Sequence, residues 1–240
     1  MTLTIGHTEV PYQVEKNRGR GISLRFREES AVLLIRTPSG KLDQHAQEFI
    51  QDKQKWILKH YDNKRAYASR RQQFRDQIRQ GRIPYLGVMT EIVFLRGKQR
   101  RVKLVDGNIQ LVLKAEDPDH LSLSYLYAGL RALAKDYLVQ RTLDLAKYTE
   151  SRVNQIRVKD QKSKWGSCSG KSNINLNWHL ILLNPSLIDY VIIHELMHLR
   201  EMNHSKRFWG WVEHFYPDYK LAEKELKQMG WLIGIMKVLS

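Results

Sequence analysis

"VIIHELMHLREMNH", residues 191–204, places three histidines and two glutamates directly behind an apolar, β-branched run. The preceding Asn184-Pro185 predicts a helix start, with asparagine as the cap and proline as the first helical residue. A helix from Pro185 to about Met202 would therefore carry these titratable groups into a protein core. A metal site, a hydrogen-bonded polar cluster and an accident of composition are the three interpretations that this pattern leaves open.

The first two histidines have the spacing of metal ligands. His194 and His198 are four residues apart, so on a helix their imidazoles project from one face about one turn apart. Two neutral imidazoles placed in this way suit a tetrahedral Zn²⁺ ion that keeps an open position for water. Glu195 points about 100° away from His194 and could take a proton from that water without being a ligand. We therefore favour a catalytic zinc site, with Glu195 as its base.

The third ligand requires a turn in the chain. His204 follows His194 by ten residues, which is a rise of about 15 Å on a straight helix. Asn203 can adopt the left-handed conformation that ends helices, and such a turn would bring His204 back to the metal. Glu201 is the alternative ligand, but its backbone lies beyond His198 and its side chain would have to fold backward. We favour His204, with Glu201 orienting a neighbouring group.

Composition limits the class of protein. The chain has 240 residues, of which 42% are hydrophobic and 27% charged, enough to bury a core in one large domain or two small ones. Cys168 is the only cysteine, so no intrachain disulfide can form and a reducing compartment is expected. No apolar run approaches the roughly 18 residues of a membrane span, and the first residues lack the apolar core of a signal peptide. We expect a cytoplasmic protein that does not contact a membrane.

The net charge of +15 is uneven along the chain. Residues 1–115 hold 23 Lys and Arg against 11 Asp and Glu, whereas residues 116–240 hold 17 against 14. The acidic, proline-containing stretch 115–121 also precedes a change from alternating to helical periodicity. We therefore predict two domains, a basic β-rich domain with a long helix over 1–115 and the metal-bearing domain over 116–240.

Periodicity predicts the elements of both halves. Strands are expected at 8–14, 21–27 and 31–36, then a helix from 42 to about 81, and then β segments at 85–95 and 101–113 with a hairpin turn at Asp106-Gly107. A helix over about 120–151 should follow, then a strand at 154–160, a Gly/Ser turn at 164–172 and a strand from 173 that precedes the histidine helix. No internal repeat is evident.

Several motifs, taken in order, resemble one family. They are "WGSCS" (165–169), "NINLNWHLILLNP" (173–185), "DYVIIHELMHLREMNHSKRFW" (189–209) and "YPDY" (216–219). They resemble the YgjP-like metallopeptidase domain, which is related to the SprT-like and other HExxH zinc peptidases. The likeness covers about residues 135–230, with a fainter part over the N-terminal strands and the Trp56-Ile57 helix. Lys164 departs from the family, which usually has Arg before WGSC, and Glu201 departs from metzincin-type motifs, which carry Gly there.

The resemblance implies a ligand set and a fold. It implies Zn²⁺ on His194, His198 and His204, with Glu195 catalytic. It also implies an α+β fold, in which the N-terminal β-rich unit with its long helix is followed by a zincin-like (minigluzincin) catalytic domain. In such a domain a small mixed sheet packs on the HExxH helix, and an edge strand aligns an extended substrate.

The expected activity is zinc-dependent hydrolysis of peptide bonds in a peptide or protein substrate. The substrate backbone is expected to pair with the exposed edge of the strand at 172–178. A donor to the developing negative charge is also expected. Its candidates are Arg207, His214, Tyr216 and Tyr219. Trp165, Trp209 and Trp211 could line a substrate cleft, although aromatic residues at this spacing, like Phe208, are more often core.

Two other functions use the positive charge. A metal-dependent nucleotide phosphohydrolase would attract phosphates, but the chain has no glycine loop of the kind that cradles them. A nucleic-acid-associated protease of SprT-like type would bind nucleic acid or another polyanion through its basic N-terminal half. Its candidate contacts, on one predicted helical face, are Arg71, Arg75, Arg79 and Arg82. An ordinary solvated helix explains the same stripe. The oligomeric state does not follow from the sequence.

Overall fold

A computed structural model of the chain describes residues 1–27, 30–118, 122–233 and 235. It is a mixed α+β fold, as expected, and its contacts divide it into two compact units, Met1–Gln73 and Phe74–Ser240. The boundary expected from charge lay between residues 115 and 116. The structure divides the chain earlier, because the strands between 82 and 113 share one apolar core with the histidine helix. Charge therefore does not follow packing in this chain.

The first unit is a four-stranded sheet with helical cover. Its strands β1 (Thr2–Ile5), β2 (Thr8–Lys16), β3 (Ser23–Phe26) and β4 (Leu33–Thr37) have the order β1-β2-β4-β3. Helix α1 (Gln44–Asp52) follows and ends at Lys53, and α2 (Gln54–Arg79) begins directly after it. The single helix predicted from 42 to 81 is thus two helices. Apolar side chains of α1 and α2 bury the sheet residues Phe26 and Ile35.

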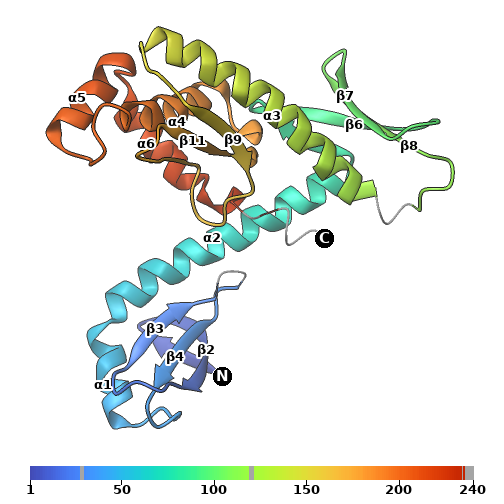
Figure 1. The fold of residues 1–240 in the computed structure, drawn as a ribbon. Coiled ribbons are helices and arrows are strands. Elements are labelled where there is room, and N and C mark those ends of the chain that lie inside the picture. Colours follow the sequence, from blue (N-terminus) through green and yellow to red (C-terminus); the bar gives the residue numbers. More distant parts are fainter. Residues whose placement is uncertain (28–29, 119–121, 234, 236–240) are drawn as a thin grey trace. The chain divides into compact units, whose positions relative to one another are not determined.

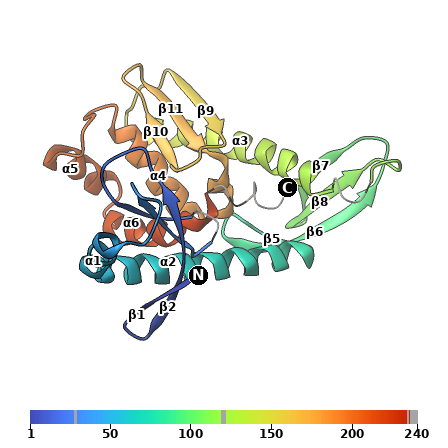
Figure 2. The same cartoon turned by 90° about the horizontal axis from the view of Figure 1, so that it is seen from below.

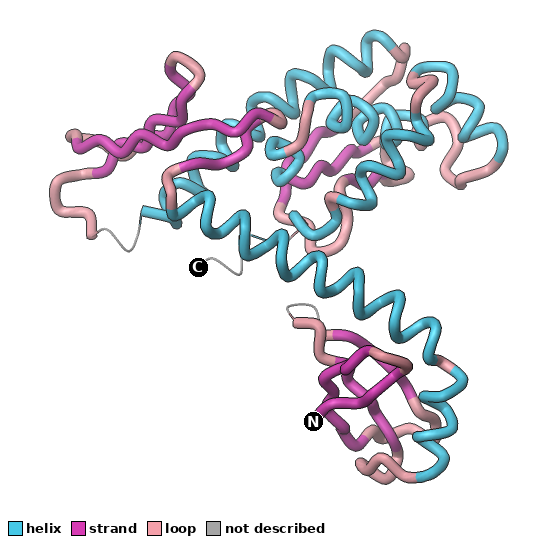
Figure 3. Tube along the Cα trace, turned by 180° about the vertical axis from the view of Figure 1, so that it is seen from behind, coloured by secondary structure: helices cyan, strands magenta, loops and turns pink. Residues whose placement is uncertain are grey.

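The second unit begins with another four-stranded sheet. Strands β5 (Arg82–Tyr85), β6 (Val88–Arg96), β7 (Arg101–Val105) and β8 (Asn108–Leu113) have the order β5-β6-β8-β7. The predicted hairpin turn is confirmed, since Asp106 and Gly107 have φ values of 48° and 76°. Most of the β segment predicted at 85–95 is strand β6, and its first residues lie in the turn at Leu86 and Gly87 that joins β6 to β5. Figure 3 shows these strands as a group separate from the small sheet that follows.

The two four-stranded sheets are copies of one arrangement. In each, the long second strand pairs parallel with the fourth, and the third strand pairs antiparallel at the edge. The registers agree: Tyr12 faces Leu33 in the first sheet as Ile92 faces Ile109 in the second. A helix of 26 residues comes after the first sheet and one of 27 residues after the second. The chain therefore contains an internal repeat, which the sequence does not display because the copies share a hydrophobic pattern and few identical residues.

The remaining elements form the histidine-bearing part of the second unit. Helix α3 (Ser122–Tyr148) comes first, and residues 120 and 121 of its predicted span lie outside the described residues. Strands β9 (Gln155–Lys159), β10 (Gly166–Cys168) and β11 (Asn173–Asn177) follow, then the 3-10 helix η2 (Trp178–Leu182) and α4 (Pro185–Met197). The chain continues with α5 (Lys206–Phe215), α6 (Tyr219–Gln228) and the 3-10 helix η3 (Gly230–Leu232). Figure 1 shows α3 reaching from the β5–β8 sheet to the small sheet, and it packs against β7, β9 and α4.

The small sheet has mixed pairing and lies against α4 (Figure 2). Its order is β10-β11-β9, with β11 antiparallel to β10 and parallel to β9. The expectation that the strand at 172–178 offers a free edge to substrate is therefore wrong, because β11 has a hydrogen-bonded neighbour on both sides. Ile174 and Leu176 are fully buried in the core beneath it. The edge that lies next to α4 is β10.

The turn between β5 and β6 contacts the start of α4. Leu86 N donates a 2.7 Å hydrogen bond to Ile181 O, and a Cβ at Gly87 would lie 2.7 Å from Asn184 Cα. Gly87 also has a φ of 78°, so both its conformation and this close approach require glycine. Asn184 caps α4 by accepting from Leu187 N at 2.8 Å, as predicted. The β5–β6 hairpin thus contacts the residue that begins the histidine helix.

The structure bears on two expectations, the arginine stripe and the lack of a membrane span. Helix α2 ends at Arg79 and Arg82 is the first residue of β5, so the predicted four-arginine helical stripe loses its last member. Among the helices of the described residues, none combines the length and the apolar character that a membrane span requires.

Asp117 supplies a test of stability in the loop before α3. Its buried carboxylate accepts from Arg100 Nε at 2.9 Å and from Lys114 N at 2.8 Å. The Arg100 hydrogen bond is the main cause that lowers the pKa of Asp117 to about 2, although burial acts in the opposite direction. Because the folded-state pKa lies below that of the unfolded chain, this carboxylate stabilises the fold above about pH 4, and the stabilisation is lost between about pH 4 and pH 2.

We therefore expect Asp117→Asn to lower the free energy of unfolding at pH 7, with a difference from the parent that shrinks as the pH falls through that window. Urea denaturation at several pH values measures it. Asp106→Asn, in the exposed hairpin turn, is the control and should differ little from the parent at any pH. A deficit for Asp117→Asn that stays constant from pH 7 to pH 2.5 would contradict the account.

Candidate metal centre

Helix α4 carries the two histidines that the HExxH spacing predicts. Its residues Ile188, Ile192 and Leu196 are fully buried, so the helix lies inside the core with the histidine face at its C-terminal end. The helix ends at Met197 with His198 as its cap. It is therefore about one turn shorter than the predicted helix, which extended to Met202.

The early end of α4 allows the third histidine to return. Residues after His198 form turns, with Leu199 N and Arg200 N bonded to carbonyls three residues back. Asn203 does not adopt the expected left-handed conformation, because its φ is not positive. Its side-chain Oδ1 instead accepts from Ser205 N at 3.0 Å. A local hydrogen bond at Asn203, and not a left-handed cap, shapes this turn.

Three imidazoles converge at this turn. One ligand nitrogen from each of His194, His198 and His204 lies within 4.8 Å of the other two. The Nε2 atoms of His194 and His204 are 3.2 Å apart, close to the roughly 3.3 Å expected for two nitrogens at about 2.0–2.1 Å from one tetrahedral zinc ion. Within the described residues this is the one group of three or more His, Cys, Asp or Glu side chains close enough to share a metal.

One phenyl ring supports all three imidazoles. Phe208 is fully buried, as its expected place in the core requires, and its ring stacks on His198 with centroids 4.5 Å apart. The rings of His194 and His204 meet the same phenyl ring edge-on at 4.9 and 4.8 Å. Packing on Phe208 fixes the positions of the three imidazoles. Because a phenyl ring has no hydrogen-bonding group, it does not compete for their nitrogens.

The hydrogen bonds of the rings direct their Nε2 atoms toward one another. His198 Nδ1 lies 3.2 Å from Glu201 O, and since a carbonyl only accepts, Nδ1 carries the proton and Nε2 keeps a lone pair. Glu201 acts here through its backbone, whereas its carboxylate is 3.9 Å from Arg207 Nε. His194 Nδ1 is buried and has no hydrogen-bond partner among the described residues. Nε2 is therefore the nitrogen that each α4 histidine offers to a metal.

Burial keeps the two α4 histidines neutral. It lowers the pKa of His194 to about 3, with the nearby His198 and His204 contributing in the same direction. Burial also lowers the pKa of His198, although the hydrogen bond to Glu201 acts against this shift. Neutral imidazole is the form that binds a metal. The donor set, its spacing and its protonation all fit zinc.

Glu195 lies between α4 and the edge strand β10. It is 6% exposed, and a Cβ at Gly166 would lie only 2.7 Å from its Cγ and Oε1 atoms. The backbone N–H of Cys168 donates to the carboxyl group, and the charge of Lys164 acts on it. Burial outweighs both and raises the pKa of Glu195 to about 7. A carboxyl group in this state can accept and release a proton near neutral pH.

The segment before β10 is held by one buried asparagine. Asn177 Nδ2 donates to the carbonyls of Gln161 and Lys164 at 3.0 and 2.9 Å. Asn177 N donates to Trp165 O at 2.8 Å. These bonds join the end of β11 to the residues that lead into Gly166, so the strand beside Glu195 starts from a fixed position. No local sequence pattern indicates this role for Asn177.

The four predicted oxyanion donors occupy different settings. Tyr216 donates its hydroxyl hydrogen to Ser186 O at 3.1 Å, and the ring of Tyr219 is stacked on Trp209. Arg207 is 82% exposed in its side chain and faces Glu201, while His214 packs against Phe215 and Trp211. None of the four is brought next to Glu195 by a contact in the described structure, so this role stays unassigned.

Comparison with known proteins identifies the family. The sequence profile described as "YgjP-like, metallopeptidase domain" matches residues 20–229. This chain belongs to the YgjP-like metallopeptidase family. It is accordingly a peptide-hydrolysing enzyme of a class that uses a metal cofactor, and it contains three histidines able to bind one. Among curated proteins, none matches the chain closely enough to count as a relative.

Two solved structures are similar to part of this YgjP-like metallopeptidase. One is the metallopeptidase zymogen of Pyrococcus abyssi abylysin, 24% identical, covering 37% of this chain and 90% of its own, with a TM-score of 0.35. The other is the metallopeptidase zymogen of Methanocaldococcus jannaschii jannalysin, 25% identical, covering 40% of this chain and 97% of its own, with a TM-score of 0.34.

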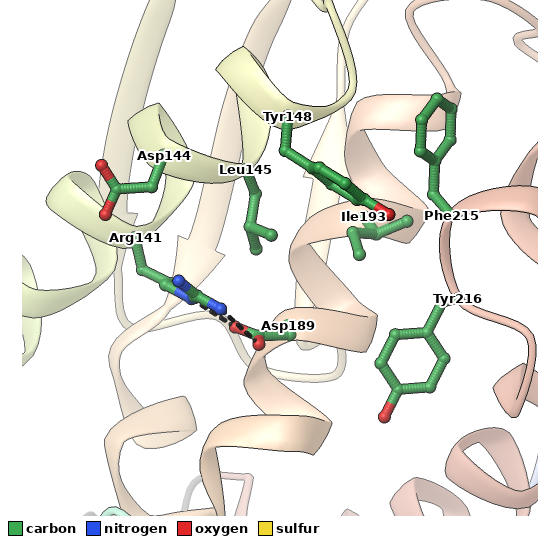
Figure 4. Close-up of a pocket in the computed structure, with 8 residues that line it drawn as sticks. All are labelled: Arg141, Asp144, Leu145, Tyr148, Asp189, Ile193, Phe215 and Tyr216. Carbon is green, nitrogen blue, oxygen red and sulfur yellow. Dashed lines mark hydrogen bonds and ion pairs between the residues drawn. The ribbon is translucent and has the colours of Figure 1, made fainter.

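A cavity of about 410 Å³ is lined by residues of α3, α4 and α5 (Figure 4). Its walls include Tyr148, Ile193 and Phe215, and one end is formed by the ion pair of Arg141 with Asp189, whose two hydrogen bonds are each 2.7 Å long. Ile193 and Glu195 are two residues apart on one helix and so point in nearly opposite directions. The cavity therefore lies on the face of α4 that points away from Glu195, and the ion pair joins α4 to α3.

Gly166 gives a direct test of the Glu195 environment. In Gly166→Ala the new methyl group must displace the Glu195 carboxyl group. Because a shift of about 1 Å in a reacting group can cost about 10²-fold in rate, we expect peptidase kcat to fall by about that factor. Rates on a peptide substrate, with circular dichroism to confirm folding, measure the effect.

Gly170→Ala is the matched control, because a Cβ at Gly170 would meet nothing within 4 Å. It should keep the parent rate. Equal rates for Gly166→Ala and Gly170→Ala would show that the approach of β10 to Glu195 has no bearing on the reaction.

Proposed function

We propose that this chain is a zinc-dependent metallopeptidase in which His194, His198 and His204 bind the zinc ion and Glu195 is the general base. The observation that carries the proposal is the convergence of three imidazole nitrogens within 4.8 Å of one another, at the end of a buried helix. The 3.2 Å separation of two Nε2 atoms suits zinc, and the neutral state of the α4 histidines leaves their nitrogens able to bind a metal.

Glu195 moves the proton in the proposed mechanism. A zinc ion at the three imidazoles would supply Lewis-acid activation of a water molecule and of the peptide carbonyl. The Glu195 carboxylate takes a proton from the attacking water and then delivers it to the departing amine. Its burial suits both steps, because a carboxyl pKa near 7 lets the group accept a proton and release it at neutral pH. The close contact with Gly166 keeps the side chain in place during the reaction.

The substrate backbone is proposed to lie along β10. This strand is at the edge of the small sheet, so the side of it away from β11 is not paired within the sheet. An extended peptide added to that edge would run beside Glu195, which packs against Gly166. Main-chain pairing does not depend on the side chains of the substrate. By itself it would therefore accept peptide or protein substrates without a required sequence.

The other two functions receive less support. Membership of a metallopeptidase family favours peptide substrates over the nucleotide phosphohydrolase that was the alternative. Binding of nucleic acid through the basic N-terminal half stays a prediction.

Glu195→Gln separates metal binding from hydrolysis. The amide keeps the size of the side chain but cannot take a proton, so we expect zinc to stay bound while kcat falls by at least about 10²-fold. Elemental analysis and peptide hydrolysis on the same sample measure both. Glu213→Gln, an exposed change on α5, is the control and should leave both unchanged. A Glu195→Gln variant that turns over like the parent excludes the proposed base.

Removal of the metal tests its identity. Dialysis against a chelator should abolish hydrolysis, because Glu195 would then face a water molecule that no metal ion polarises, and stoichiometric Zn²⁺ should restore it. Mg²⁺ should not, since imidazole nitrogens suit zinc and magnesium prefers oxygen ligands. Full activity in the chelated, metal-free protein would contradict the proposal.

A further inference from the structure

The third histidine is held differently from the other two. His194 and His198 project from the rigid end of α4, and His198 is also fixed by its hydrogen bond to Glu201 O. His204 is exposed and lies in the turn between α4 and α5. Among the described residues, the hydrogen-bonding contact of its ring is Nε2 with His194 Nε2. Within the described part of the chain, no hydrogen bond of the kind that usually orients a metal-binding histidine fixes this ring, and unlike His194, which also lacks one, His204 is not part of a helix.

Aromatic rings take the place of that hydrogen bond. The indole of Trp209 stacks on the His204 imidazole with centroids 5.7 Å apart and planes inclined by 29°. The ring of Tyr219 also stacks on the indole of Trp209, with centroids 5.2 Å apart and planes inclined by 21°. Phe208 meets His204 edge-on at 4.8 Å. His204 thus packs against the ring of Trp209 on α5, which packs in turn against the first residue of α6.

We propose that Trp209, supported by Tyr219, is a positioning residue that holds His204 in the orientation needed for metal binding. The inference rests on the proposed function, because it takes His204 as the third ligand. Ordering an exposed imidazole costs rotamer entropy, and a stack that orders the ring before the metal arrives removes that cost from the binding step. Metal binding also draws electron density from the imidazole, and the face of an indole stabilises a ring that becomes more positive.

Two residues outside the HExxH motif, Trp209 and Tyr219, would then have a role at the metal site. Trp209 directly follows the buried Phe208 in the sequence. The Phe208 ring contacts His204 edge-on, and the Trp209 ring contacts it face-on. Tyr219 lies at the start of α6, and its ring is 9% exposed, which leaves it little freedom to move. The segment after the metal ligands therefore contributes to the site through ring packing.

The test compares the zinc affinity of the full-length parent with that of Trp209→Ala, using a competing chelator. Loss of an outer partner of a metal-binding histidine typically lowers metal affinity about 10–100-fold, and we expect a loss in that range. Tyr219→Ala, which removes only the support, should cause a smaller loss. Trp209→Phe, which keeps a ring at the stack, should recover most of the affinity. A parent-like affinity for Trp209→Ala would overturn the proposal.

Trp211→Ala is the matched control for the loss of an indole. Trp211 is on the same helix, two residues away, but its ring packs against Phe215 and Arg200 and no metal-site histidine. It should bind zinc as the parent does, and an affinity loss equal to that of Trp209→Ala would mean that loosening of α5 alone explains the result. Thermal melting of the metal-free proteins shows whether each variant is folded at the assay temperature.

Cobalt(II) provides a readout that general destabilisation does not change. At saturating Co²⁺, a third nitrogen held in place gives the intense visible absorption of a four-coordinate site. We expect Trp209→Ala to have weaker bands than the parent, and Trp209→Phe to have parent-like bands. Identical spectra for Trp209→Ala and the parent would contradict the positioning role.

His204→Ala separates failure of this inference from failure of the ligand assignment. If His204→Ala loses zinc affinity while Trp209→Ala does not, the three-histidine site stands and only the positioning role is wrong. If His204→Ala binds zinc as the parent does, the ligand assignment itself is wrong, whatever the effect of Trp209→Ala.

Discussion

The packing of three imidazoles on the ring of Phe208 is the contact on which the proposed metal centre depends. Two of the histidines come from α4 and the third from the turn that follows, and each ring lies within 4.9 Å of this one buried phenyl ring. An apolar ring can fix positions without taking up a hydrogen bond. The ligand nitrogens therefore remain directed at one another, with the Nε2 atoms of His194 and His204 3.2 Å apart, which is an arrangement that a metal ion would satisfy.

The position of Glu195 depends on a different constraint, the close approach of β10. Any side chain at Gly166 would meet the carboxyl group, so the absence of a Cβ there lets the strand lie against the helix. The strand is placed in turn by β11, whose apolar residues are buried in the core and whose Asn177 holds the preceding segment. The small sheet thus has two roles, since it positions the proposed base and presents an edge next to it.

The catalytic unit also includes strands that charge alone would assign elsewhere. The β5–β8 sheet contacts the capped start of α4 through Leu86 and Gly87, and α3 joins that sheet to the histidine helix. The first unit repeats the strand order and register of this sheet. The turns before the long second strand differ, because Leu86 and Gly87 both have a positive φ, whereas in the first copy Gly6 has one and His7 does not. The two sheets therefore share strand order and register but not this turn.

The sequence by itself determined what depends on near neighbours: the HExxH pair on one helix face, the Asn184 cap, the Asp106-Gly107 turn and the resemblance to the family. Spacing and capping act within a few residues, so local patterns are enough to predict them. Only the tertiary structure decided that α4 ends at Met197, that β11 is central in its sheet, that Gly166 adjoins Glu195, and that Trp209 stacks on His204. These features join elements that are distant in the chain, and such contacts are set by how side chains fill a shared core, which no local pattern encodes.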